Sequence, residues 1–345
     1  MQLLAGGGVS LGDEIKAESS DAELRRALND ALRKLAKAKA KTDDLIDAVH
    51  RAAGDAFLAN PALPVAAPAR DPRKARPEVA LWHLTDWQGA KVTPTYNSEV
   101  MHERVRRFMD KAERITAIER SDHPVRDAWI LFGGDMIEGL FQFPTQAFEV
   151  DATLFDQYVT VSHLIAETVR RALGMYDRVT VIGEWGNHGR VGSKRDAVPR
   201  SDNFDRMCYH AARLELGEQP RLTWEDSAED IQRVEIGNYR ALSMHSDEVG
   251  RTGWVAEGTF LNYIHKLKAG GYGWAFRDVY TGHRHVHGEF TLSDGASSWY
   301  LTGSTESDNR YARNGMGVRG EPSQRLHFNE PERGVVTTQY KVRLG

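Results

Sequence analysis

The chain lacks three features that would each point to a particular class of protein. Its 345 residues include one cysteine, Cys208, which excludes an intramolecular disulfide and a cysteine-rich zinc site. No apolar run approaches the roughly 20 residues that a membrane-spanning helix needs. The N-terminus has neither the basic nor the apolar segment of a secretory signal. We therefore expect a reducing, cytoplasmic location and no membrane partner.

A strong charge imbalance is also missing. The formal net charge of -4 argues against a surface that binds nucleic acid over its whole extent, although a local basic groove remains open. The hydrophobic content of 41% and charged content of 27% are ordinary for a globular protein. The length suits one large α/β domain with an appendage.

The first 78 residues differ in pattern from the rest. Residues 1–20 are expected to be a disordered lead. Apolar residues at helical spacing, with capping residues Ser20 and Thr42, predict a helical hairpin over 21–58. Residues 59–78 are rich in proline, alanine and charge, as in a linker. The hairpin's apolar stripe needs a partner, and a homodimer is one candidate. Its basic residues could bind nucleic acid, or they could form an ordinary solvent-exposed face of the helices.

Strand and helix patterns alternate over 79–345. We expect strands at 79–85, 128–132, 179–183, 234–236, 239–245, 278–281, 288–292 and 298–302. Helices are expected around 101–115, 154–169, 204–214 and 260–267. This order predicts an α/β domain of stacked sheets covered by helices.

Polar residues follow five of the predicted strands at the point where each strand ends. They are Asp86 and Gln88, then Asp135, then Asn187 and His188, then His245, and last His283 and His285. Ligand sites of α/β sheets lie beyond the carboxyl ends of strands, so we expect these groups to converge on a metal site. Glycines at 133, 134, 186 and 282 allow the backbone to turn sharply there. Among the histidines outside the pattern, four are expected to be structural: His83, His163, His210 and His327.

The ordered motifs D-x-Q, GD, GNH, H and GHxH resemble those of the calcineurin-like metallophosphoesterases, from residue 79 to about 310. The sequence is also similar to those of phage-encoded, Mre11-like members of this family. A phage origin would place the protein in the cytoplasm of the host cell. The resemblance implies a two-sheet β-sandwich flanked by helices (αββα) that holds two divalent metal ions. It implies that Asp86, Gln88 and His285 hold the first ion, that Asn187, His245 and His283 hold the second, and that Asp135 bridges both.

The same resemblance implies phosphoester hydrolysis. Two cations about 3.5–4 Å apart clamp a phosphoryl group and activate a bridging water as the attacking hydroxide. His188 is then the candidate general acid. Glu138 stands three positions after Asp135, where the protein-phosphatase branch has an acidic residue that orients this histidine. Arg190 lies beside the motif and can grip a phosphate oxygen.

Two positions depart from the usual pattern. Gln88 stands where many relatives have histidine, and an amide oxygen favours Mn²⁺, or Mg²⁺, over Zn²⁺, with Fe²⁺ also open. Gly189 stands where many relatives have an acidic residue, which removes one supporting carboxylate.

Two loop features favour a nucleic-acid phosphodiesterase similar to Mre11-type nucleases. Basic residues gather over 190–206, although aspartates are intermixed. Four loop aromatics could stack on bases or simply pack: Trp87, Phe141, Phe143 and Trp254. The alternative is a phosphatase or phosphodiesterase for small molecules or phosphoproteins, which Glu138 and the acidic net charge favour. A more remote alternative is a non-catalytic scaffold that keeps the fold.

Overall fold

The computed structural model describes residues 64–74, 76–142, 146–192, 199–225, 229–247, 256–309 and 319–345, with a few isolated positions besides. The chain divides into two units, Met1–Ala52 and Ala53–Gly345. The predicted lead and helical hairpin lie outside the described residues, apart from scattered positions. The fold below is that of the second unit.

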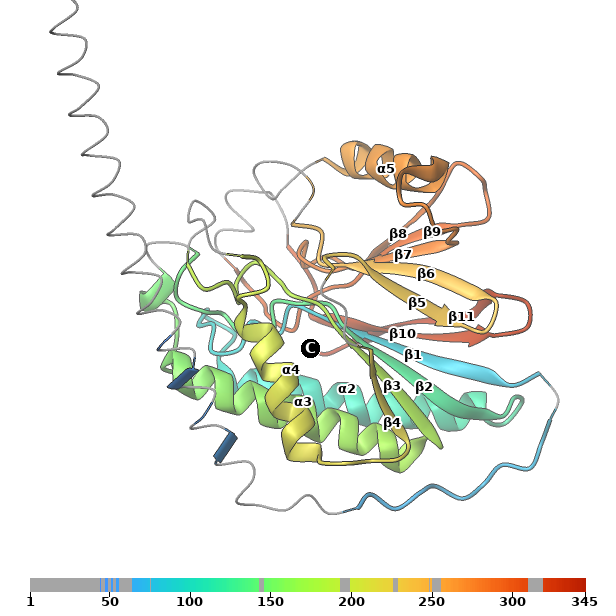
Figure 1. Ribbon diagram of the computed structural model, residues 1–345, viewed down its shortest axis with the longest axis horizontal. Coiled ribbons are helices and arrows are strands. Elements are labelled where there is room, and N and C mark those ends of the chain that lie inside the picture. The colour runs from blue at the N-terminus through green and yellow to red at the C-terminus, as the bar shows by residue number, and fades with distance from the viewer. Residues whose placement is uncertain are drawn as a thin grey trace, which may run out of the picture. The chain divides into compact units, whose positions relative to one another are not determined.

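Two β-sheets stack face to face (Figure 1). The first has the order β11-β10-β1-β2-β3-β4, and the second has the order β5-β6-β7-β9-β8. The strands of the first sheet are β1 (Glu78–Leu84), β2 (Val125–Phe132), β3 (Arg178–Gly183), β4 (Leu222–Glu225), β10 (Ser323–Glu330) and β11 (Val335–Arg343). Those of the second are β5 (Gln232–Ile236), β6 (Tyr239–Met244), β7 (Asp278–Thr281), β8 (Gly288–Thr291) and β9 (Ser298–Leu301).

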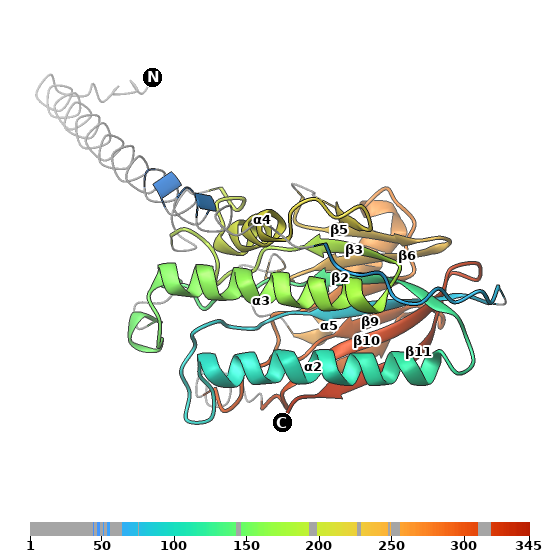
Figure 2. The ribbon, with the colours of Figure 1, turned by 90° about the horizontal axis from the view of Figure 1, so that it is seen from below.

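Helices cover the outer face of each sheet. Helices α2 (Ser98–Glu119), α3 (Leu154–Met175) and α4 (Phe204–Leu216) lie along the first sheet, as Figure 2 shows from below. Helix α5 (Glu257–Lys266) covers the second sheet and continues into a π-helical turn, Leu267–Gly271. A short 3-10 helix, Gln146–Phe148, precedes α3. The predicted αββα architecture is confirmed. Among the described residues, no helix combines the length and apolar character required to cross a bilayer.

Apolar side chains fill the space between the layers. Leu81 and Leu131 of the first sheet pack against Ala241 and Tyr280 of the second. On the outer side of the second sheet, Phe260 of α5 joins the cluster formed by Leu242, Val279 and Trp299. Burial of these side chains, at about 25 cal/mol per Å² of apolar surface, holds the sheets at a fixed separation.

The sequence pattern did not predict β4, β10 or β11. Strand β10 is buried along its whole length and pairs antiparallel with β1. Its alternate residues Arg325, His327 and Asn329 are polar, although each is at most 2% exposed. The Arg325 guanidinium and the His327 ring both lie against Tyr300 of the opposite sheet. A polar face inside the sandwich hides the apolar alternation from which a strand is predicted.

Parallel pairing sets the place of the functional loops. Strands β1, β2 and β3 run parallel to one another, and so do β6, β7 and β9. The loops that follow them therefore leave each sheet along one edge. Every predicted ligand lies in one of these loops.

A buried hydrogen-bond chain joins the two sheets and yields a pH prediction. The Tyr239 hydroxyl donates to Asp278 Oδ2 at 2.9 Å, and Tyr280 lies within hydrogen-bond distance of both Tyr239 and His327. Burial raises the pKa of Asp278 to about 6. The folded state thus binds the proton more tightly than the unfolded chain, so the stability from this group is complete below pH 4 and falls as the pH rises through 6.

Replacing Asp278 with asparagine removes this titration. Between pH 4 and 7 the variant should lose about 2–3 kcal/mol less of its free energy of unfolding than the unsubstituted protein loses. Urea unfolding at a series of pH values measures the difference. Parallel pH profiles for the two proteins would contradict the prediction.

Candidate metal centre

Most of the predicted ligands lie on unusual backbone. Asp86, Gln88, Asp135, His283 and His285 have φ values between 49° and 67°, the left-handed region that non-glycine residues rarely adopt. Such conformations cost roughly 1 kcal/mol or more each, and persist where the surrounding structure fixes them. The sequence assigned the sharp turns to the neighbouring glycines. Gly134 does turn in this way, with a φ of 84°, but the other left-handed positions named above are the ligand residues themselves.

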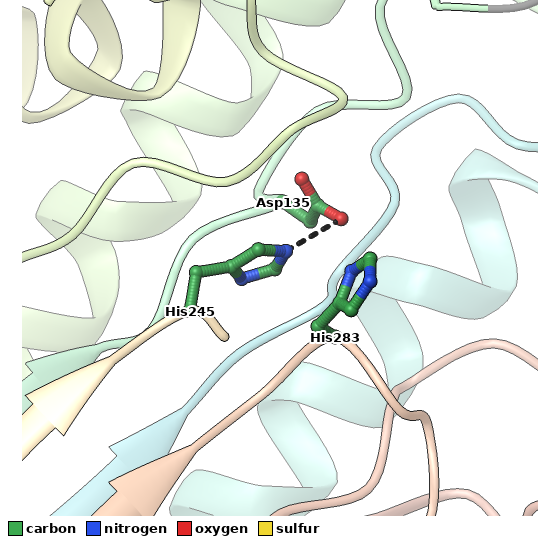
Figure 3. Close-up of side chains that lie close together, drawn as sticks. All are labelled: Asp135, His245 and His283. Atoms are coloured by element: carbon green, nitrogen blue, oxygen red, sulfur yellow. Dashed lines mark ion pairs between the residues drawn. The ribbon is translucent and has the colours of Figure 1, made fainter. Parts of the chain in front are cut away.

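Asp135, His245 and His283 form the tightest group. Their ligand atoms all lie within 4.8 Å of one another, and Figure 3 shows the three side chains directed at a common point. His245 Nε2 lies 3.0 Å from Asp135 Oδ2. His245 Nδ1 is 2.7 Å from the carbonyl oxygen of Gly133, to which it donates. This bond fixes the tautomer and directs the Nε2 lone pair into the centre.

Asp86, Gln88 and His285 form a second group that touches the first. His285 Nε2 lies 3.2 Å from Asp86 Oδ1. Gln88 Nε2 lies 3.3 Å from Asp135 Oδ2 and 3.4 Å from His285 Nε2. Asp135 therefore stands between the two groups, where a bridging ligand belongs. An amide coordinates through oxygen, so Gln88 would have to turn its amide by half a rotation to bind a cation.

Asn187 lies in a loop whose adjacent residues, Gly186 and His188, contact Asp135. The backbone N–H of His188 donates to Asp135 Oδ1 at 2.7 Å, which ties the loop after β3 to the loop after β2. A Cβ atom at Gly186 would lie 2.0 Å from Asp135 Oδ1, so only glycine allows the loops to approach this closely. The Asn187 side chain is 9% exposed.

Two buried atoms of these residues have no hydrogen-bond partner among the described residues. They are Gln88 Oε1 and Asn187 Oδ1. Buried polar atoms are rarely left unpaired without a ligand to satisfy them. With the carboxylates of Asp86 and Asp135 and the imidazoles of His245, His283 and His285, they make an oxygen-rich, nitrogen-containing set that suits Mn²⁺, Fe²⁺, Mg²⁺ or Zn²⁺. The residues present fit a pair of divalent cations.

His188 lies outside both groups. Its Nε2 is 4.0 Å from Asp135 Oδ2, and its Nδ1 is 3.2 Å from Glu138 Oε2. Burial by itself would lower the pKa of His188, but the carboxylates of Glu138 and Asp135 outweigh it and raise the pKa to about 9. Lys91 in turn pairs with Glu138 at 3.0 Å. The predicted contact between Glu138 and His188 is present.

Arg190 does not extend freely toward the centre. Its guanidinium binds Asp247 Oδ2 at 2.5 Å, and Arg200 binds the other carboxylate oxygen at 2.7 Å. Two of the basic residues over 190–206 thus share one buried acid, while Lys194 and Arg195 lie outside the described residues. Among the loop aromatics, Trp87 is buried against Phe132, whereas Phe143 and Trp254 lie outside the described residues.

The sequence did not identify two carboxylates beside the centre. Glu306 Oε1 lies 2.9 Å from His285 Nδ1, and Asp205 accepts bonds from the backbone of the loop after β2. Glu306 follows β9, so the same strand-end reasoning that found the ligands could have found it. Asp205 lies in the first turn of α4 and gives no comparable signal.

Replacing Glu306 with glutamine should weaken one cation site. The carboxylate holds the His285 ring and makes Nε2 a better ligand, and loss of such a partner typically lowers metal affinity about 10–100-fold. We expect calorimetric Mn²⁺ titration to show one weakened step and one retained step. Glu321→Gln, at an exposed acid paired with Lys341, is the control. Two unchanged steps in Glu306→Gln would contradict the role.

The chain matches no protein-family profile and no curated protein sequence. Solved structures with a similar fold include Vps29 in complex with Zn²⁺ from Entamoeba histolytica, at 12% identity and a TM-score of 0.34, covering 77% of this chain and 99% of that one. A hypothetical protein from Pyrococcus horikoshii has 12% identity and a TM-score of 0.39, covering 77% and 89%. A predicted phosphoesterase from Streptococcus pneumoniae has 10% identity and a TM-score of 0.28, covering 77% and 99%. Likenesses at this level do not assign a function to this chain.

Proposed function

We propose that the chain is a dinuclear-metal-dependent phosphoester hydrolase of the calcineurin-like metallophosphoesterase family. One observation carries the proposal. Ligand-type side chains from loops after β1, β2, β6 and β7 gather at one place. Two ligand atoms, Gln88 Oε1 there and Asn187 Oδ1 in the loop after β3, are buried without hydrogen-bond partners among the described residues.

The residues of the site fall into two groups: those that would bind the cations and those that would transfer a proton. Asp86, Gln88 and His285 would hold one cation, and Asn187, His245 and His283 would hold the other. Asp135 would contact both. When bound, the two cations polarise the phosphoryl oxygens and activate a water for in-line attack.

His188 is placed to supply a proton to the leaving oxygen. Its Nδ1 is directed at Glu138, with Gln146 Nε2 also 3.2 Å away, so the ring is held with Nε2 on the side of Asp135. Glu138 is a positioning residue in this proposal, because it fixes the ring without reaching the centre.

For the substrate we propose a nucleic-acid phosphodiester, with Mn²⁺ as the cation. Arg190 and Arg200 place two guanidinium groups beside the centre, where Asp247 and Asp230 balance their charge, and phosphate backbones are bound mainly by such cations. The Glu138–His188 contact favours the second candidate, a phosphatase, because an acid at that position resembles the protein-phosphatase branch.

A substrate panel tests both. The purified protein with Mn²⁺ is incubated with single-stranded DNA, duplex DNA, bis-p-nitrophenyl phosphate and p-nitrophenyl phosphate. Cleavage of DNA and of the diester supports the nuclease. Cleavage of the monoester alone supports the phosphatase. No turnover of any of the four would overturn the proposal that the chain is a hydrolase.

A further inference from the structure

The N-terminus of α4 is bound to two loops that carry proposed ligands. Asn203 caps the helix by accepting from the N–H of Asp205 at 2.8 Å, and its own Nδ2 donates to the carbonyl of Gly186, also at 2.8 Å. The N–H of Phe204 donates to the carbonyl of Gly189 at 2.6 Å. The start of this helix is therefore hydrogen-bonded to the loop after β3 on both sides of Asn187.

The Asp205 carboxylate forms further hydrogen bonds, which connect the start of α4 to the loop after β2 as well. Its Oδ2 accepts from the N–H of Asp135 at 2.8 Å and from the N–H of Gly186 at 2.9 Å. Its Oδ1 accepts from the N–H of Met136 at 3.0 Å. Asp205 is fully buried, so water does not compete for these bonds. Oδ1 also accepts from the N–H of Ile137 at 3.4 Å, so one carboxylate binds four amides from two different ligand loops.

The loop after β2 needs such a restraint. Asp135 has a φ of 52° and Gly134 before it a φ of 84°, so the loop after β2 makes a left-handed turn just where the bridging carboxylate is placed. Backbone in this region returns to commoner conformations unless its N–H groups are held. The bonds from the amides of Asp135 and Met136 to Asp205 hold it.

The space beside His188 is also shaped by this carboxylate. A Cβ atom at Gly189 would lie 2.3 Å from Asn203 Oδ1 and 3.0 Å from Asp205 Cγ. A side chain at position 189 and the observed side chains at 203 and 205 exclude one another. The side chains at the start of α4 therefore restrict position 189 to glycine.

We propose that Asp205 is a positioning residue that fixes the Asp135 loop against the Asn187 loop before any cation binds. The inference rests on the proposed function for the identity of the ligands. It gives Asp205, a helix residue that is not itself a ligand, a role in forming the metal centre. It also predicts that the two ligand loops have the same conformation in the metal-free protein.

The variant Asp205→Asn tests the role with little change in shape. An amide has one accepting oxygen and presents N–H groups on the other side, so it cannot accept from all four backbone amides. We expect Mn²⁺ affinity to fall about 10–100-fold and the electron paramagnetic resonance signal of a coupled Mn²⁺ pair to weaken. Asp202→Asn, at a partly exposed acid of the same segment, is the matched control and should behave like the unsubstituted protein.

The outcomes separate the two proposals. If the unsubstituted protein binds no Mn²⁺ pair, the proposed function is overturned. If it binds the pair and Asp205→Asn binds it equally well, the role of Asp205 is overturned.

Hydrogen exchange of the unsubstituted, metal-free protein gives a second measurement, which decides the question even if the variant does not fold. The amides of Asp135, Met136 and Gly186 should exchange slowly because the carboxylate binds them. Exchange at the rate of open loop amides in the metal-free protein would overturn the inference.

Discussion

Replacing Asp135 with asparagine should lower phosphoester hydrolysis by about 10³-fold or more and should abolish binding of the second cation. Although burial opposes ionisation, His245 and His188 hold the pKa of Asp135 well below its usual range, so the group is a carboxylate. It lies between the two ligand groups, 3.0 Å from His245 and 3.3 Å from Gln88. An amide of the same size removes the negative charge that allows two cations to lie close together, which is worth several kcal/mol.

Metal content and turnover of Asp135→Asn are measured together. Elemental analysis counts the bound Mn²⁺, and hydrolysis of bis-p-nitrophenyl phosphate gives the rate. Asp278→Asn is the matched control, because it also neutralises a buried aspartate but lies at the start of β7, away from the ligand loops. Full metal content and full activity in Asp135→Asn would remove it from the bridging position.

Replacing His188 with glutamine should keep both cations and lower the rate according to the leaving group. A general acid contributes about 10²–10⁴-fold where the leaving oxygen is a poor leaving group and much less where it is a good one. The loss should therefore be large for a dinucleotide or an alkyl ester and small for a p-nitrophenyl ester.

Kinetics over a series of esters measures this dependence, and metal analysis shows whether the ligands are intact. His163→Gln, at an exposed histidine paired with Glu215, serves as the control and should leave every rate unchanged. An equal loss across the series would argue against proton donation by His188. Loss of metal would instead make it a ligand.

The sequence predicted the architecture and the gathering of the ligand-type residues because both follow from local pattern. Strand ends at Thr85, Gly133 and Gly282 are marked by apolar runs and glycines, and parallel pairing brings such ends to one edge. Strand β10 was missed because Arg325 and His327 interrupt the apolar pattern. Asp205 was missed because its partner Asp135 lies 70 residues away, and no local pattern reports a contact at that separation.

The conformation of the proposed ligands could not be predicted either. Left-handed backbone is common at glycine, and glycines stand beside the ligands, so the sequence assigns the turns to them. The structure places Asp86, Asp135 and His283 themselves in that region. Hydrogen bonds from distant side chains and from the other loops decide which residue of each loop turns.

Left-handed backbone at the proposed ligand positions lowers the stability of the fold, although the side chains at these positions are among those that would bind the cations. Glycine at a left-handed ligand position whose side chain makes only long contacts, such as Gln88, would relieve roughly 1 kcal/mol of backbone strain and would delete a ligand in the same step. A laboratory selection for heat resistance in the presence of a chelator should therefore enrich such replacements and erode the centre one position at a time. With a cation in the medium, the same selection should retain the ligands, because the free energy of binding then exceeds the strain.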